Sequence, residues 1–326
     1  DQPFEERREL EKVRAYHFAE AGIKRWVKMP LWINAVGRSE RLDCVIALLT
    51  FANLAAIAAR VVSGNSLHCL ISEHNVPSVL LRSEGVRGRL QLALAKGAYR
   101  FADAAVAVSH PIAADLVGAF RVRPERVWVV PNPLTTAVVV PSAPPSCITV
   151  AFAGRLVKQK RPDRLAETLL NLQARGVSAR GIVIGDGPLR RTLEELCSEY
   201  GVECNFVGWR DDWRSFAKSA DCLLLPSDIE GFGNVLVEAA AVGLPVVACS
   251  RALGVADAIV PGMTGVLAVS TKPADLADAV LQAAGGTSPS SGIERWLSWF
   301  STANSCSILE KALVSFDSVR KVKAES

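Results

Sequence analysis

The second half of the chain alternates short apolar runs with amphipathic helical patterns, and this alternation restricts the fold more than any other feature of the sequence. Six apolar runs bounded by Gly, Pro or Ser lie at residues 148–154, 181–187, 204–209, 222–227, 245–250 and 264–269. Strands that alternate with helices in this way form βαβ units around a parallel sheet. Six strands are enough for a complete doubly wound domain.

The first half repeats this alternation with fewer strands. Four strand candidates lie at residues 42–51, 66–74, 103–110 and 126–133, and the residues before Leu42 have a helical pattern. The sequence therefore predicts an α/β protein with two Rossmann-like doubly wound domains, of which the N-terminal one is incomplete.

A segment rich in Pro, Ser and Thr, residues 131–146, separates the two halves and is typical of a linker. The length of 326 residues also favours two domains. We predict an N-terminal domain at 1–135, a linker at 136–146, a C-terminal domain at 147–290, and C-terminal helices at 291–326.

The cysteines and the longest apolar stretch bear on the location of the protein. Eight cysteines are scattered without a C-x-x-C pair, which is typical of reduced, buried thiols in a cytoplasmic protein. Residues 44–62 have nearly the length of a membrane span, but Thr50 and Asn53 interrupt them. A strand followed by a helix is therefore favoured over a span.

Positive charge is concentrated in the first half. Residues 1–140 carry 18 Lys and Arg against 13 Asp and Glu, whereas the rest carry 19 against 20. An anionic membrane surface, an acidic ligand or an ordinary soluble surface would each account for this excess. Residues 25–38 mix Trp, apolar and basic residues at helical spacing, and a buried helix face is favoured there over peripheral membrane contact. No nucleic-acid partner is predicted.

Two acids eight residues apart, Glu230 and Glu238, flank a glycine-rich segment. Glu230 follows a buried strand, at the sheet edge where α/β proteins bind ligands. The next four residues open a helix, whose free N–H groups suit a phosphate. Glu238 lies about one turn past Asn234, where a carboxylate can accept two hydrogen bonds from a vicinal diol. The alternative is a solvent-facing glutamate on a surface helix.

Cations and glycines follow other strands at the same predicted edge. Gly154 ends a strand, and Arg155 and Lys160 follow it in a short loop before a helix, an arrangement that suits a diphosphate. Gly185 and Gly187 form a tight turn after the next strand. In the first half, His74 also ends a strand and faces the predicted cleft, although a lone histidine in a loop is more often structural.

The motifs resemble those of GT-B fold retaining glycosyltransferases of the family 4-like kind, the glycosyl transferases of group 1. The resemblance covers about residues 42–269. It rests on the segments AGRLVKQKRPDRL, IGDGPLRRTLEEL and SADCLLLPSDIEGFGNVLVEAAAVGLPVVA, and on ISEHN, ADAAVAVS and VVPNP in the first half.

The resemblance implies a donor site for a nucleotide-diphosphate sugar in the C-terminal domain, with no other cofactor and no essential metal. It places Glu238 on the nucleotide ribose and Glu230 on donor sugar hydroxyls. It places Arg155 and Lys160 on the diphosphate and His74 near the donor sugar. Backbone groups at the glycine-rich turns complete the implied binding set: Gly154, Gly185, Gly187, Gly231, Phe232, Gly233 and Asn234.

The resemblance also implies transfer with retention to a glycan or lipid-linked acceptor. Same-face attack assisted by the leaving phosphate is favoured over a covalent intermediate on Glu230. The chain contains no Asp-x-Asp, in agreement with metal-independent chemistry. The implied location is the cytoplasm, with the inner face of the membrane as an alternative.

The first half departs from the family pattern. Family members open with a strand and a Gly-rich loop, whereas this sequence shows neither before Leu42. We therefore expect an N-terminally shortened or diverged chain. A non-catalytic nucleotide-sugar-binding subunit and a nucleotide-sugar epimerase stay as alternatives, whereas a dehydrogenase is disfavoured because no G-x-G-x-x-G follows a strand.

Overall fold

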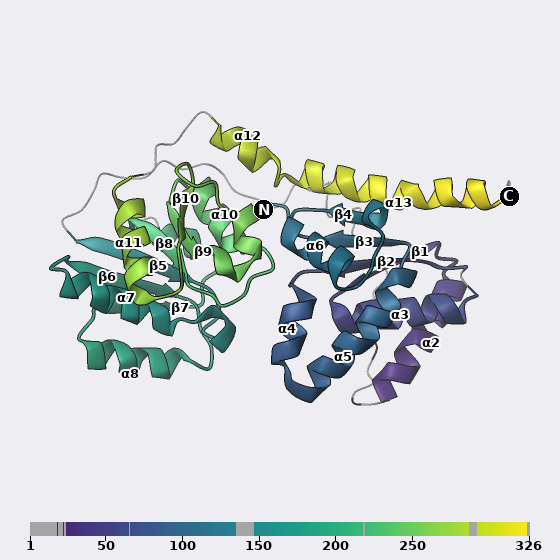
Figure 1. The fold of residues 1–326 in the computed structure, drawn as a ribbon, viewed down its shortest axis with the longest axis horizontal. Coiled ribbons are helices and arrows are strands. Elements are labelled where there is room, and N and C mark those ends of the chain that lie inside the picture. The colour runs from purple at the N-terminus through teal and green to yellow at the C-terminus, as the bar shows by residue number, and fades with distance from the viewer. Residues whose placement is uncertain are drawn as a thin grey trace.

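The computed structural model describes Phe18, Gly22 and residues 24–64, 66–134, 147–217, 219–286 and 292–324, with side chains of the last helix up to residue 315. Two α/β domains lie side by side, each built on a parallel sheet with helices packed against it (Figure 1). The predicted class, two Rossmann-like domains, is confirmed.

The described part of the first domain contains a four-stranded parallel sheet in the order β1-β2-β3-β4. Its strands are β1 (Cys44–Leu48), β2 (His68–Glu73), β3 (Ala104–Ala107) and β4 (Val127–Val129). Its helices are α2 (Lys24–Ser39), α3 (Thr50–Val62), α4 (Pro77–Ser83), α5 (Gly85–Ala98) and α6 (His110–Gly118), with 3₁₀ turns at Tyr99–Phe101 and Pro124–Arg126. The four predicted strands are confirmed in number, and each is shorter than its apolar run.

The apolar stretch 44–62 is a strand followed by a helix, as predicted. Strand β1 ends at Leu48 and α3 begins at Thr50, so the helix takes the last two residues of the predicted strand. Within the described residues, no helix is long and apolar enough to cross a membrane.

Helix α2 packs on α3 through one side only. The Trp26 ring meets the Phe51 ring edge-on, with 4.6 Å between ring centroids. Val27 and Leu31 on the same helix are 68% and 52% exposed. The predicted buried face of residues 25–38 is therefore confirmed for part of the helix.

The second domain has a six-stranded parallel sheet in the order β10-β9-β8-β5-β6-β7. Its strands are β5 (Ile148–Ala153), β6 (Ala179–Ile184), β7 (Cys204–Gly208), β8 (Cys222–Leu225), β9 (Val246–Cys249) and β10 (Gly265–Ala268). Its helices are α7 (Asp163–Ala174), α8 (Arg190–Tyr200), α9 (Trp213–Ala217), α10 (Asn234–Ala241) and α11 (Pro273–Ala284), with 3₁₀ turns at Lys158–Lys160, Ser250–Ala252 and Gly254–Asp257. All six predicted strands are present.

The strand order of the second domain reverses between β5 and β8, which are neighbours in the sheet. Chain connections leave this point in opposite directions, so the loops after the two strands diverge and open a crevice. The strands themselves are buried on both faces, and β8 and β9 are buried at every residue. This explains their continuous apolar sequence.

The last helices, α12 (Ile293–Ser298) and α13 (Thr302–Ala324), return to the first domain (Figure 1). Ser305 Oγ donates to the Pro131 carbonyl at 2.8 Å, and Ala312 is fully buried against Leu70 and Val106 of the first sheet. The described part of the predicted C-terminal segment thus covers one face of the N-terminal domain. The predicted linker, residues 136–146, lies outside the described residues.

Candidate functional site

A pocket of about 310 Å³ opens at the reversal point of the second sheet. It is formed by the ends of β5 and β6, the loop after β7 and the first turns of α10. The residues that line it include Gly154, Gly185, Trp209, Arg210, Asp211, Trp213, Asn234 and Glu238. The structure therefore gathers at one place four residues that the sequence predicted for binding: Gly154, Gly185, Asn234 and Glu238.

Glu238 lies on α10 and forms part of the pocket wall. Trp213 Nε1 donates to Glu238 Oε2 at 2.9 Å, and an Arg214 nitrogen lies 3.4 Å from the same oxygen. The other carboxylate oxygen, Oε1, accepts no hydrogen bond from a described residue. The side chain is 24% exposed and lines the pocket, so a ligand there can reach the carboxylate. This arrangement disfavours the alternative of a solvent-facing surface glutamate.

Glu230 and Lys160 form an ion pair across the loops after β8 and β5. Lys160 Nζ lies 2.6 Å from Glu230 Oε1, and Ser227 Oγ donates to the same oxygen at 2.6 Å. Both side chains are largely buried, at 18% and 7% exposure. Sequence reasoning placed these two residues on different parts of the donor and missed their contact with each other.

Arg155 follows Gly154 directly after β5; Gly154 lines the pocket, whereas Arg155 is not among its lining residues. Its side chain is exposed, and no hydrogen bond or ion pair joins it to a described residue. Of the two cations that the sequence predicted for the diphosphate, Lys160 forms an ion pair with Glu230, whereas Arg155 has no charged partner among the described residues.

Three glycines allow backbone segments to approach closely at the site. A Cβ at Gly185 would lie 1.9 Å from the Gly154 carbonyl oxygen, so the ends of β5 and β6 could not meet there with any other residue. A Cβ at Gly231 would lie 1.9 Å from the His74 carbonyl oxygen of the first domain. Gly187 packs in the same way against the backbone of Leu156.

The first domain contacts the turn before α10 and the first residue of that helix. Ser109 Oγ donates to the Gly231 carbonyl at 2.6 Å, and Asn132 Nδ2 donates to Asn234 Oδ1 at 2.9 Å. His74 is half-buried, and its Nε2 lies 3.2 Å from Ser72 Oγ. Burial lowers the pKa of His74, so the neutral imidazole is favoured at neutral pH.

Phe232 and Gly233 follow Gly231 in the turn before α10. The Phe232 side chain is 5% exposed, and its ring packs against Phe300 with 5.5 Å between centroids. Its ring therefore belongs to the core, and only its backbone is available to a ligand. Gly233 adopts a left-handed conformation, with φ of 87°, that turns the chain into the helix.

Sequence reasoning missed three polar residues at this site. Trp213 and Arg214 orient Glu238, and Asn132 contacts the start of α10. The position of Asn132 after a strand, in the PNP segment, was the available signal. The described residues contain no group of three or more His, Cys, Asp or Glu side chains placed to hold a metal ion.

Two family models together match most of the chain, one in each half. The family described as "Glycosyltransferase Family 4" matches residues 1–138, and the family described as "Glycosyl transferases group 1" matches residues 147–285.

Curated relatives match over shorter segments. A GDP-mannose-dependent alpha-(1-6)-phosphatidylinositol dimannoside mannosyltransferase of Mycobacterium tuberculosis is 37% identical over 108 residues, which are 32% of this chain and 28% of the relative. A D-inositol 3-phosphate glycosyltransferase of Corynebacterium kroppenstedtii is 36% identical over 142 residues, 40% of this chain and 31% of the relative. The matches thus span about a third of the relatives' length.

Solved structures share the fold of both domains. The apo form of the lipopolysaccharide outer core galactosyltransferase WaaB has a TM-score of 0.74 at 22% identity, over 89% of this chain and 80% of that chain. Alr3699/HepE of Anabaena, solved in complex with UDP and glucose, has a TM-score of 0.73 at 20% identity, over 98% and 90%. The fold therefore defines a protein of the GT-B class. With the two family matches, the chain belongs to the group 1, family 4-like glycosyltransferases.

Proposed function

We propose that the protein transfers a sugar from a nucleotide-diphosphate sugar to a glycan or lipid-linked acceptor, with retention of configuration. The observation that carries the proposal is Glu238, which lines the pocket at the reversal point of the second sheet and whose Oε1 accepts no hydrogen bond from a described residue. Ligands of doubly wound domains bind at such points. The structural neighbour solved with UDP and glucose supports the same ligand class.

In this proposal the nucleotide ribose donates to Glu238 Oε1. The diphosphate lies between Arg155 and the start of α10, where free N–H groups and the helix dipole favour an anion. The donor sugar then extends toward Glu230 and His74, on the side where the two domains meet.

The proposed reaction needs no group beyond the two substrates and the protein. The bond between the anomeric carbon and the phosphate oxygen breaks, and the acceptor oxygen bonds to the same face of that carbon. The acceptor proton passes to the leaving diphosphate. Arg155 and the α10 N–H groups stabilise the charge that grows on the diphosphate, without an essential metal.

The ion pair of Glu230 favours this route over a covalent intermediate. Its Oε1 is held by both Lys160 and Ser227, and the carboxylate is 7% exposed. The ion pair with Lys160 lowers the nucleophilicity of the carboxylate, and 7% exposure leaves little room for an anomeric carbon beside it. In our proposal Glu230 orients donor hydroxyls and holds Lys160 in place.

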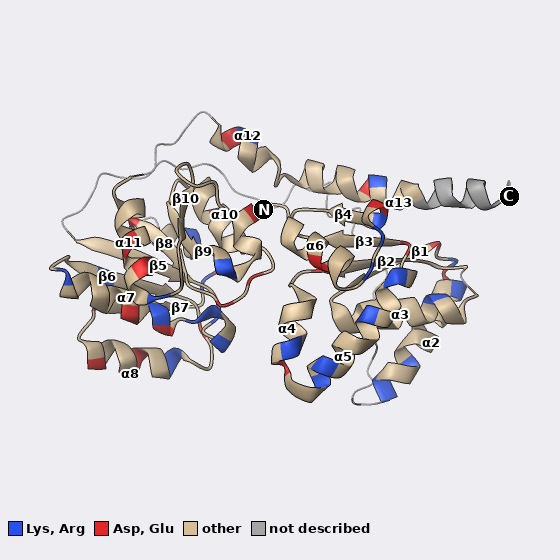
Figure 2. Ribbon diagram, in the orientation of Figure 1, with Lys and Arg blue, Asp and Glu red and all other residues tan. Residues whose placement is uncertain are grey.

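Peripheral contact with an anionic membrane is a further part of the proposal. Lys and Arg residues occur on α2, α3, α4 and α5 of the first domain (Figure 2). Among them, Lys24 and Arg25 lie close in sequence to the exposed Val27 and Leu31. All eight cysteines are free thiols, which supports a cytoplasmic location. Co-sedimentation with vesicles containing and lacking anionic lipid tests the membrane contact.

A thermal-shift panel of nucleoside diphosphates and nucleotide sugars tests the donor site. Since a ligand that binds only the folded state raises its stability, the correct donor raises Tm. Glu238→Ala abolishes most of that shift, whereas Glu195→Ala, which removes an exposed glutamate on α8, leaves it intact. If no nucleotide raises Tm at millimolar concentration, the donor-site proposal is wrong.

Product analysis separates the proposed enzyme from the alternatives. A transferase releases a nucleoside diphosphate only when it moves sugar to an acceptor or to water. An epimerase converts the donor into its isomer with the diphosphate bond intact. A non-catalytic subunit binds the donor and leaves it unchanged.

A further inference from the structure

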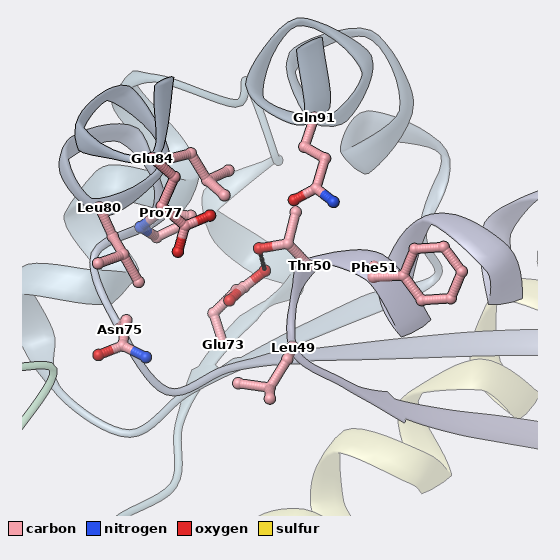
Figure 3. Close-up of a pocket in the computed structure, with 10 residues that line it drawn as sticks. Leu49, Thr50, Phe51, Glu73, Asn75, Pro77, Leu80, Glu84 and Gln91 are labelled. Carbon is pink, nitrogen blue, oxygen red and sulfur yellow. Dashed lines mark hydrogen bonds between the residues drawn. The ribbon is translucent and has the colours of Figure 1, made fainter. Parts of the chain in front are cut away.

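A second polar pocket lies in the first domain, at the carboxyl ends of β1 and β2 (Figure 3). We call it the Glu73 pocket. It has a volume of about 200 Å³, and its polar wall consists of Thr50, Glu73, Asn75, Glu84 and Gln91. The function proposed above uses none of these five side chains.

One oxygen of Glu73 carries all of its hydrogen bonds within the protein. Thr50 Oγ1 and Asn53 Nδ2 each donate to Glu73 Oε1 at 3.0 Å, and the Tyr99 hydroxyl donates to the same oxygen. The other oxygen, Oε2, accepts no hydrogen bond from a described residue. Glu73 is only 2% exposed.

Buried carboxylate oxygens nearly always have hydrogen-bond partners. Glu73 as a whole is 98% buried, but its Oε2 is not among the solvent-excluded side-chain atoms that lack a partner, so this oxygen is open to the pocket. Because Glu73 lines the pocket, the donor to Oε2 comes from what occupies that space, either water or a ligand hydroxyl.

The backbone next to the pocket supports a functional role. Leu49, which also lines it, has φ of 71° and ψ of 154°, a conformation that is rare outside glycine. Such strain costs on the order of 1–3 kcal/mol and persists where surrounding contacts hold it. Here the Leu49 N–H is held by the Ser72 carbonyl at 3.0 Å.

The lining of the pocket defines the chemistry of its occupant. It contains two carboxyl groups, two amides and one hydroxyl, and none of the residues that line it is Lys, Arg or His. A phosphate or carboxylate would meet like charge without a cation to balance it. A neutral polyol can donate to Glu73 and both donate to and accept from Asn75 and Gln91.

The remaining wall and the size of the pocket restrict this occupant further. Leu49, Pro77 and Leu80 supply an apolar surface suited to the C–H face of a sugar ring. The volume of about 200 Å³ lies below the roughly 300–1,000 Å³ typical of pockets for drug-sized ligands. A single ring therefore fits better than an extended glycan.

The Glu73 pocket borders the donor side of the molecule. Glu73 directly precedes His74, whose carbonyl contacts the Gly231 turn. Asn75 lines the pocket, and a Cβ at Gly231 would lie 2.9 Å from Asn75 Cα. A ring in the pocket would thus lie next to the end of the donor site where the sugar is placed.

We propose that the Glu73 pocket binds the neutral, polyhydroxylated ring of the acceptor, with Glu73 Oε2 accepting a hydrogen bond from one of its hydroxyls. This inference rests on the proposed function and adds the acceptor class: the ring that enters the pocket carries no phosphate or carboxylate. Gln91 and Asn75 orient the ring, and Glu84 adds to the exclusion of anions.

Glu73→Gln isolates the role of Oε2. The glutamine carbonyl can keep the three donors of Thr50, Asn53 and Tyr99, while its NH₂ group replaces the accepting oxygen with a donor. Glu125→Gln is the matched control, because Glu125 is an exposed glutamate of the same domain outside both pockets.

The experiment measures binding of neutral probes, methyl glucoside, methyl mannoside and myo-inositol, and of their phosphorylated forms. It uses calorimetry with saturating UDP or GDP at about pH 8, because burial raises the pKa of Glu73 to about 7 and Oε2 is an acceptor in the ionised form. At least one neutral probe is expected to bind, and its phosphorylated form to bind at least tenfold more weakly. Glu73→Gln is expected to lower the affinity for the neutral probe about ten- to a hundredfold, the range that corresponds to the loss of a hydrogen bond to a charged group. Asn75→Ala is also expected to lower the affinity for the neutral probe.

Each other outcome overturns the inference. Binding of no neutral probe, equal binding of a phosphorylated probe, or unchanged affinity in folded Glu73→Gln and Asn75→Ala would each do so. Nucleotide binding is measured on the same variants and is expected to stay as in the parent. Failure of the parent to bind any nucleotide refutes the donor site instead, so the two failures are distinguishable.

Discussion

Replacement of Glu73 by Gln is expected to change the pH dependence of stability. Burial raises the pKa of Glu73 from 4.5 to about 7, and Tyr99, Thr50 and Asn53 offset only part of this effect. Because the folded-state pKa is higher than the unfolded one, the folded protein binds more protons between these values. Its stability therefore decreases as pH rises from about 4.5 to 7, and the loss is complete above pH 7.

The size of this loss follows from the shift. One pKa unit corresponds to about 1.4 kcal/mol, so a shift from 4.5 to about 7 corresponds to about 3 kcal/mol. Other ionisable groups lie near Glu73: Tyr99, whose pKa is raised well above its usual value, Asp115, which raises the pKa of Glu73, and His74 and Glu84. They are common to the parent and the variant, so the difference between the two isolates Glu73.

Urea unfolding of the parent and of Glu73→Gln at about pH 5 and about pH 8 measures this difference. The variant is expected to gain about 2.5 kcal/mol relative to the parent between these pH values, because part of the effect is already present at pH 5. Glu125→Gln is expected to show no such change. A difference between parent and Glu73→Gln that stays within about 1 kcal/mol across this range would refute the reasoning.

Four further predictions concern the donor site. Glu238→Ala is expected to weaken nucleotide binding by about 1.5–3 kcal/mol in calorimetry with little change in Tm, because it removes a charged acceptor from a pocket wall; parent-like binding would contradict its role. Arg155→Ala is expected to lower kcat with stability unchanged, and EDTA to leave parent kcat unchanged; loss of activity in EDTA would contradict metal-independent chemistry. Lys160→Ala is expected to lower the free energy of unfolding in urea by about 3 kcal/mol, because it leaves Glu230 buried without its cation. The double variant with Glu230→Gln is expected to regain most of this stability. Parent stability in Lys160→Ala alone would show that the ion pair contributes little. Gly185→Ala is expected to lower Tm more than Gly97→Ala, where a Cβ meets open space; equal effects would contradict the close backbone approach.

The second domain and its pocket follow closely from the sequence. Short apolar runs bounded by Gly, Pro and Ser predict six parallel strands, because local periodicity reports burial on both faces. The position of Glu238 one turn into a helix after a strand places it at the sheet edge. Both features depend on residues close together in sequence, and the structure contains both.

Contacts between distant segments did not follow from the sequence. The Lys160–Glu230 ion pair joins residues 70 positions apart, and local patterns do not report which loops meet. Glu73 occurs in an ordinary strand pattern, and its partner Tyr99 lies 26 positions away. The return of α13 to the first sheet is a matter of tertiary packing, and its amphipathic pattern alone does not name the surface it covers.

Leu134, the last described residue of the first domain before residue 147, lies beside the short connection between α12 and α13. Its N–H donates to the Phe300 carbonyl at 2.7 Å. The Gly231 turn is a second place where distant segments meet, through Ser109 and His74. A relative motion of the domains that separates Gly231 from Ser109 and His74 can keep the Leu134–Phe300 hydrogen bond only if the domains pivot at that bond.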